Sequence, residues 1–150
     1  NFRIETDPSI SRTKVWKYIK AAYELIDQLK PLPGAIELLT KLWERTYVPT
    51  KIITSRPMEA ANITYELTRR HFKFPHQLIL VDGWEYKIDY LNDICYFVDD
   101  RRKTSLYIAT HDKIVFVPRR TYNTVENYPD NFVYINEVCD LIPLIDEFIY

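Results

Sequence analysis

The sequence predicts an α/β protein with a mainly parallel sheet and helices on both of its faces. Two features support this class. Short apolar runs alternate along the chain with longer segments in which apolar residues recur every three or four positions. Short loops join these segments, as expected when each helix returns the chain to the next parallel strand. With 150 residues, 47% of them hydrophobic, the chain suits a single domain with one buried core.

The first part of the chain is predicted to be mostly helical. Residues 1–10 form at best a short strand, because two apolar side chains alternate with polar ones before Pro8 breaks the pattern. Apolar spacings of three and four predict helices over residues 11–30, 35–47 and 57–72. Gly34 follows the first helix, Pro49 follows the second, and Pro57 is the first residue of the third. The helical residues expected to face the core are Ile36, Leu39, Leu42, Trp43, Met58, Ala61, Tyr65 and Phe72.

Strands and helices then alternate to the end of the chain. Strands of apolar, β-branched and aromatic residues are predicted over residues 51–54, 77–81, 94–98, 113–117 and 132–135. Helices are predicted over residues 86–91, 103–110 and 138–148. The uninterrupted apolar run at 94–98 predicts a strand buried on both faces. Pro143 limits how regular the last helix is.

Composition argues against several classes of function. A formal net charge of -1 gives no broad basic surface for a nucleic-acid polymer, and no apolar run is long enough to span a membrane. Only two glycines occur, which argues against a glycine-rich phosphate loop. Cys95 and Cys139 lie in apolar stretches without the spacing of metal ligands. We expect them to be buried reduced thiols, which favours a cytoplasmic location.

Polar side chains follow three of the predicted strands. They are Thr54, Ser55 and Arg56 after the first, Lys87 after the second, and Asp99 and Asp100 after the third. Ligands of open α/β sheets bind outside the carboxyl ends of the strands, and hydroxyls, cations and carboxylates together can hold a phosphate and its Mg²⁺. Each group also has an alternative explanation that involves no ligand. Ser55 caps the next helix, Lys87 is a surface lysine, and the two aspartates are solvated or cap a helix.

The ordered set of motifs resembles the haloacid dehalogenase superfamily of phosphohydrolases, and within it the 5'-nucleotidase and deoxyribonucleotidase branch. The segments that carry the resemblance are Pro31–Ala35, Ile52–Pro57, Lys87, Phe97–Arg101 and Pro118–Asn123. The resemblance covers roughly residues 15–150. It implies a three-layer Rossmann-like fold, with residues 31–150 as the core and residues 11–30 as the remnant of a helical cap.

The resemblance also implies a magnesium-dependent phosphohydrolase. Its substrate would be a small phosphorylated molecule such as a nucleoside monophosphate. Thr54 would bind the substrate phosphate, and Lys87 would neutralise the phosphate and the nucleophile. Ser55 and Arg56, which follow Thr54 just before the predicted helix start, offer further donors to the same phosphate. Asp99 would coordinate Mg²⁺, with Asp100 beside it.

The first motif of the family is where this sequence departs from the pattern. Members carry an Asp-x-Asp signature at the end of a first, central strand, the first Asp being the nucleophile and the second the acid. Here Glu5 would replace the nucleophile, Asp7 would keep the acid, and Pro8 stands in place of the glycine that follows. Glutamate is a poor substitute, because a misplacement of about 1 Å can cost about 10²-fold in rate.

Two explanations of this departure are open. Either Phe2–Glu5 forms a degenerate first strand, or that strand comes from an upstream segment or from another chain, which a second copy could supply. In the family it lies between the strands ending at Thr54 and Asp99, and an empty position would leave backbone groups unpaired on both sides.

The sequence is compatible with two hypotheses about function. The first is a phosphatase. The second is a catalytically impaired binding or regulatory module of the same fold. A receiver-like signalling domain also ends its strands in acids and a lysine, but it fits the Thr-Ser-Arg-Pro and Pro-Leu-Pro-Gly segments less well.

Overall fold

The computed structural model describes residue 21 and residues 30–148. The strand predicted over residues 1–10 therefore lies outside the described residues. The same holds for the helix predicted over residues 11–30, apart from Ala21, which is helical, and the loop residue Lys30.

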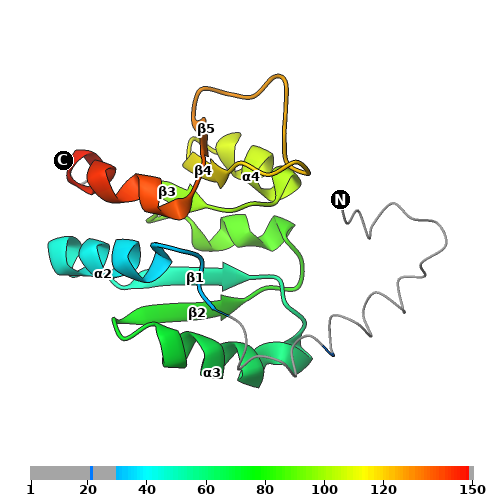
Figure 1. Cartoon of the computed structure of the whole chain (residues 1–150). Helices are drawn as coiled ribbons and strands as arrows, with labels where there is room; N and C mark the ends of the chain where they lie inside the picture. Colours follow the sequence, from blue (N-terminus) through cyan, green and yellow to red (C-terminus); the bar gives the residue numbers. More distant parts are fainter. Residues whose placement is uncertain (1–20, 22–29, 149–150) are drawn as a thin grey trace.

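The described part is a mixed α/β structure with two short parallel sheets (Figure 1). One sheet pairs β1 (Thr50–Thr54) with β2 (His76–Leu80), and the other has the order β3 (Tyr96–Val98), β4 (Ile114–Pro118), β5 (Phe132–Ile135). All pairs are parallel, with Ile52 opposite Leu78 and Phe97 opposite Val115. The carboxyl ends of the strands within each sheet therefore lie at one edge.

Helical segments connect the strands. The α-helices are α2 (Ala35–Thr46), α3 (Ala61–His71), α4 (Arg102–Ala109) and α5 (Ile145–Phe148). The 3-10 helices are η2 (Met58–Ala60), η3 (Glu85–Tyr90) and η4 (Val138–Leu144). α3 contacts β2, α4 contacts β4 and β5, and α2 packs against η4. The predicted irregularity of the last helix is confirmed, because Pro143 lies inside the 3-10 segment η4 and lacks the N–H of a regular helix.

Two hydrophobic clusters form the core. The first contains residues of both sheets, among them Ile53 of β1, Val115 and Val117 of β4, and Phe132 of β5. The second joins α2 to η4, with Leu38 and Leu141 among its buried members. The two sheets therefore share one core, although no backbone ladder connects them within the described residues.

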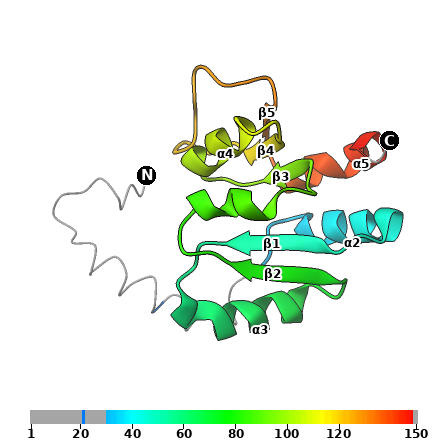
Figure 2. The same ribbon diagram turned by 180° about the vertical axis from the view of Figure 1, so that it is seen from behind.

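The region between β1 and β3 is the position where an additional strand was predicted. Within residues 30–148, β1 and β3 each pair with a strand on one side only. In Figures 1 and 2, β1 is drawn nearer to β3 than β2 is, and η3 is drawn at a level between the two sheets. Side chains connect this region: the ammonium group of Lys51 on β1 contacts the carboxylate of Asp93 and lies 3.3 Å from the carbonyl oxygen of Tyr90.

Three helical side chains that were predicted to be buried are exposed. Ile36 is 40%, Met58 71% and Tyr65 55% exposed, so these predictions are wrong. Other residues on the same elements are buried, namely Leu38, Ala60, Thr64 and Thr68.

Helix α3 shows why the buried face differs from the predicted one. It begins at Ala61, after the 3-10 turn η2, which changes the face that meets the sheet. Thr64 and Thr68 can be buried there because their hydroxyls donate to main-chain carbonyls, 2.8 Å from the oxygen of Ala60 and 2.9 Å from that of Tyr65.

The strand predicted over residues 94–98 is shorter and less buried than expected. β3 begins at Tyr96, Val98 is 42% exposed, and Cys95 is exposed outside the strand. β3 lies at an edge of its sheet within the described residues, whereas β4, which has strands on both sides, is almost completely buried. Cys95 and Cys139 are both free, but the prediction that both are buried is wrong.

Candidate functional site

The central feature of the site is a buried ion pair between η3 and the end of β3. The Lys87 Nζ lies 2.6 Å from Asp99 Oδ2, and their side chains are only 11% and 8% exposed. The other carboxylate oxygen, Asp99 Oδ1, accepts the main-chain N–H of Arg101 at 2.7 Å. Lys87 is thus not a surface lysine, and the carboxylate of Asp99 is not a solvated one.

The main chain of Asp99 is held from two sides. Asp99 comes one residue after the end of β3, and its N–H donates to the carbonyl of Phe116 on β4 at 3.3 Å. Its carbonyl accepts the hydroxyl of the fully buried Ser105 on α4 at 3.1 Å. β4 and α4 therefore fix the position from which the carboxylate extends.

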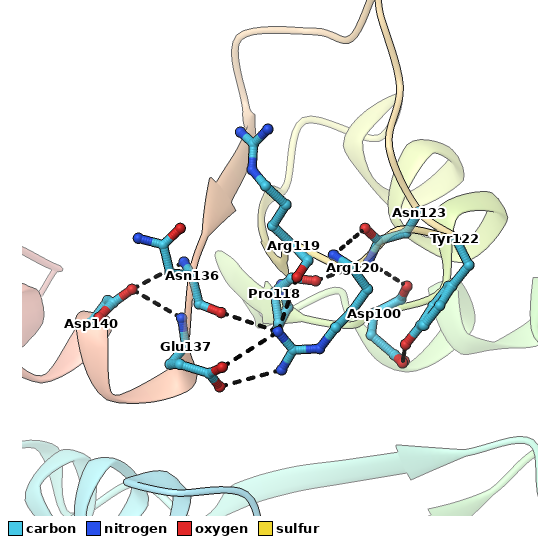
Figure 3. A network of polar contacts seen from close by, with 9 residues as sticks. All are labelled: Asp100, Pro118, Arg119, Arg120, Tyr122, Asn123, Asn136, Glu137 and Asp140. Carbon is cyan, nitrogen blue, oxygen red and sulfur yellow. Dashed lines mark hydrogen bonds and ion pairs between the residues drawn. The ribbon is translucent and has the colours of Figure 1, made fainter. Parts of the chain in front are cut away.

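The carboxylate of Asp100 has a different partner from that of Asp99. It accepts the phenolic hydroxyl of Tyr122, which belongs to the loop after β4 (Figure 3). The main-chain carbonyl of Asp100 accepts the side-chain amide of Asn123 at 2.9 Å. The two adjacent acids are thus held separately, one by η3 and the other by the loop after β4.

Thr54 and its neighbours lie at the carboxyl end of the other sheet. The carbonyl of Thr54 accepts the N–H of Val81 at 3.0 Å, and the guanidinium of Arg56 lies 3.3 Å from the hydroxyl of Thr64. Thr54, Ser55 and Arg56 are each partly exposed. In the described part of the chain, no hydrogen bond joins Thr54 to Lys87 or Asp99. The structure therefore brings Lys87 and Asp99 together and leaves Thr54 at the neighbouring strand end.

The helix start predicted at Pro57 is wrong. Pro57 is extended and precedes the three-residue 3-10 helix η2, with no side-chain cap. The α-helix itself begins four residues later at Ala61, where again no side chain caps it. The alternative in which Ser55 caps the helix is therefore also wrong. Of the other predicted site residues, Glu5 and Asp7 lie outside the described residues.

The two carboxylates at the end of β3 are ligands of the type that Mg²⁺ takes. Mg²⁺ keeps several water ligands and commonly takes one or two protein carboxylates together with substrate oxygens. Asp99 and Asp100 supply two carboxylates, and each of their hydrogen-bonded oxygens has a second lone pair. Among the described residues no group of three or more His, Cys, Asp or Glu side chains forms a metal cluster.

Sequence reasoning missed two residues of this region, Tyr122 and Asn123. Tyr122 contacts the carboxylate of Asp100, and Asn123 is 0% exposed, which is unusual for a polar side chain in a loop. The Pro118–Asn123 segment was part of the family resemblance, but its residue types alone gave these two side chains no role.

The ionisation of Tyr122 yields a prediction about stability at high pH. Burial and then the hydrogen bond to Asp100 raise the pKa of Tyr122 from 10.0 to about 12. Between these values the phenol stays protonated in the folded chain and ionises in the unfolded one. Its contribution to stability is thus fully present below pH 10.0 and is lost as the pH rises to about 12.

The test compares Tyr122→Phe with the unsubstituted protein by denaturant unfolding across this pH window. The unsubstituted protein should lose more stability than the variant, and tyrosinate absorbance should show one late-titrating phenol fewer in the variant. Parallel pH profiles for the two proteins would contradict the prediction.

A comparison with protein-family models, curated proteins and solved structures found no match for the chain. Among the described residues no helix has both the length and the apolar character needed to cross a membrane.

Proposed function

We propose that this chain is the core of a magnesium-dependent phosphohydrolase of the haloacid dehalogenase type, with that family's three-layer Rossmann-like fold. Its substrate would be a nucleoside monophosphate or a similar small phosphate ester. One observation carries the proposal: Lys87 and Asp99, 12 residues apart, form a buried ion pair 2.6 Å long at the end of β3. These are the two residues to which the resemblance gives the cation and the metal-binding carboxylate.

Each residue has a role that follows from its charge. The ammonium of Lys87 would offset the negative charge of the substrate phosphate and of the attacking carboxylate. Asp99, with Asp100, would hold Mg²⁺, which when bound supplies further positive charge to the phosphate oxygens. Thr54 would donate its hydroxyl to the phosphate from the end of β1.

The reaction requires a nucleophilic carboxylate. Its oxygen would form a bond to phosphorus while the bond from phosphorus to the ester oxygen breaks, and an acid would protonate the departing alcohol. Water would then attack the acyl phosphate, releasing inorganic phosphate and restoring the carboxylate. Thr54 and Lys87 would bind and orient the phosphate through both steps, while the two aspartates would hold Mg²⁺.

The nucleophile would come from a strand inserted between β1 and β3. Both strands lack a second partner within residues 30–148, and the carboxyl end of an inserted parallel strand would lie between Thr54 and Asp99. Two sources are compatible with this position. One is the N-terminal segment of this chain, with Glu5 as nucleophile and Asp7 as acid. The other is a strand from an upstream segment or another chain, including a second copy.

A second candidate function is a binding or regulatory module without phosphatase activity. Both oxygens of Asp99 already have protein donors, namely Lys87 Nζ and the main-chain N–H of Arg101. A closed ion pair of this kind is also compatible with a purely structural role of the site.

Phosphatase assays distinguish the two candidates. p-Nitrophenyl phosphate and a panel of nucleoside monophosphates are incubated with Mg²⁺ and the parent protein, Asp99→Asn or Asp93→Asn. Asp93 is the matched control, because it also pairs with a lysine but its side chain is 71% exposed. We expect Asp99→Asn to lose at least about 10²-fold in rate and Asp93→Asn to keep the parental rate. A parent protein that is inactive on every substrate would overturn the phosphohydrolase in which this chain supplies its own nucleophile, and would leave the binding module and the strand from another segment or chain.

A further inference from the structure

The Pro118–Asn123 segment has no part in the proposed reaction, yet it contacts the aspartate pair directly. We infer that Asn123 is a positioning residue that sets the direction of the Asp99 carboxylate, acting through the peptide group between Asp100 and Arg101. The geometric part of this inference stands on the structure alone. Its consequence for a bound cation rests on the proposed function.

Every hydrogen-bonding group of the Asn123 side chain is used. The amide nitrogen lies 2.9 Å from the carbonyl oxygen of Asp100 and 2.9 Å from that of Pro118, and the amide oxygen accepts the N–H of Arg120 at 2.9 Å. The residue is 0% exposed, so water does not compete for these contacts. Among uncharged side chains, only an amide offers two N–H donors and an acceptor from one group.

These contacts link the ends of two neighbouring strands. The ladder between β3 and β4 extends to Val98 and Phe116, followed by the hydrogen bond from Asp99 N–H to Phe116. Beyond that point Asn123 connects the carbonyls of Asp100 and Pro118 and takes the place of direct pairing. The turn that carries both aspartates is therefore tied to the end of β4.

The loop that carries Asn123 is itself anchored. The guanidinium of Arg120 contacts the carbonyl of Asn136 at 3.3 Å and the carboxylate of Glu137 at 3.3 and 3.5 Å (Figure 3). The carbonyl of Asn123 accepts the hydroxyl of Tyr134 on β5 at 2.7 Å. Because β5 and the two residues between β5 and η4 hold the loop, Asn123 acts from a fixed position.

One rigid group connects Asn123 to Asp99. The carbonyl of Asp100 and the N–H of Arg101 belong to the same peptide unit, which is planar and trans, so they point in opposite directions. Asn123 holds the carbonyl end, and the N–H end donates to Asp99 Oδ1 at 2.7 Å. Rotation of this plane would move the donor away from Asp99. Asn123 thereby fixes one oxygen of the carboxylate whose other oxygen contacts Lys87.

The test uses Asn123→Ala with a matched control elsewhere in the sheet. Asn131 also donates its side-chain amide to two main-chain carbonyls, those of Ala109 at 2.7 Å and Lys113 at 2.9 Å, but it lies just before β5, beside the amino end of β4. Asn131→Ala thus removes the same kind of contact away from Asp99. Asn123→Ser is a second variant with a smaller change in polarity.

Two measurements separate the inference from the proposed function. The first is the NMR shift and hydrogen exchange of the Arg101 amide without metal. We expect both Asn123 variants to lose the protection of this amide and Asn131→Ala to keep it. The second is Mn²⁺ binding, which should weaken about 10- to 100-fold in the Asn123 variants and stay unchanged in Asn131→Ala.

The outcomes are distinguishable. A folded Asn123 variant whose Arg101 amide stays protected overturns the inference, whatever its affinity for Mn²⁺. Failure of the parent protein to bind Mn²⁺ in a manner that depends on Asp99 contradicts the proposed function alone. If neither Asn123 variant folds, the unsubstituted protein provides the test, because an Arg101 amide that exchanges much faster than the Asn123 side-chain amide overturns the inference.

Discussion

Lys87→Met is expected to lower the free energy of unfolding by about 3–5 kcal/mol, the usual cost of breaking a buried ion pair. Methionine keeps much of the apolar stem of lysine, so the substitution mainly removes the charge. The carboxylate of Asp99, with its side chain only 8% exposed, would then keep a single described donor, the N–H of Arg101. The loss arises because a buried charge is left without its counter-charge.

Lys51→Met is the matched control for this prediction. Lys51 also contacts an aspartate across the region between the sheets, but its partner Asp93 has a side chain that is 71% exposed. Because solvent screens such a pair, we expect Lys51→Met to lose much less stability than Lys87→Met. Urea unfolding of both variants gives the comparison, and equal losses would contradict a special role for burial.

A second substitution tests the reason for the Lys87 effect. Adding Asp99→Asn to Lys87→Met removes the unpaired charge and should restore part of the lost stability, because the asparagine oxygen can still accept the N–H of Arg101. A double variant less stable than Lys87→Met alone would show that the carboxylate is not the source of the loss.

The encounter between Lys87 and Asp99 could be predicted from the sequence, but the way each aspartate is held could not. Parallel strands place their carboxyl ends at one edge, so polar residues that follow successive strands are expected to meet. The partner of Asp100 depends instead on the path of the loop after β4, which carries no periodic signal. The role of the Asp100–Arg101 peptide depends on its orientation, which no residue type specifies.

Apart from the start of β3, strand positions were predicted well, whereas the buried faces of the helices were not. β4 and β5 lie within one residue of their predicted bounds, because continuous apolar runs in a parallel sheet have few alternatives. Met58 and Tyr65 were placed inward on the assumption of one continuous helix from residue 57. The 3-10 turn η2 breaks that assumption, and burial of Thr64 and Thr68 depends on hydrogen bonds to carbonyls that a hydrophobicity pattern does not reveal.

Gly34→Ala is the second substitution expected to have a large effect, a loss of about 2–5 kcal/mol from backbone strain and overpacking together. Gly34 precedes α2 with a φ of 76°, a left-handed conformation that costs a residue with a Cβ free energy. An added Cβ would lie 2.9 Å from the Cα of Cys139 and closer still to its Cβ. The main chain of η4 would have to move.

Such a movement is costly because η4 is part of the second core cluster. Val138 and Leu141, on either side of Cys139, are buried against Leu38 of α2 and cannot shift without opening that cluster. The absence of a side chain at residue 34 is therefore what lets the start of α2 approach η4 closely.

Gly83→Ala is the control that separates strain from collision. Gly83 also has a positive φ, 126°, but the atoms nearest to an added Cβ would be those of the Glu85 carboxylate, at 3.0 Å, and that exposed side chain can rotate away. Gly83→Ala therefore reports backbone strain without a collision against the main chain, and we expect Gly34→Ala to be the more destabilising of the two. Denaturant unfolding of both variants measures the difference. Equal losses would mean that the close approach of α2 to η4 is not what requires glycine at residue 34.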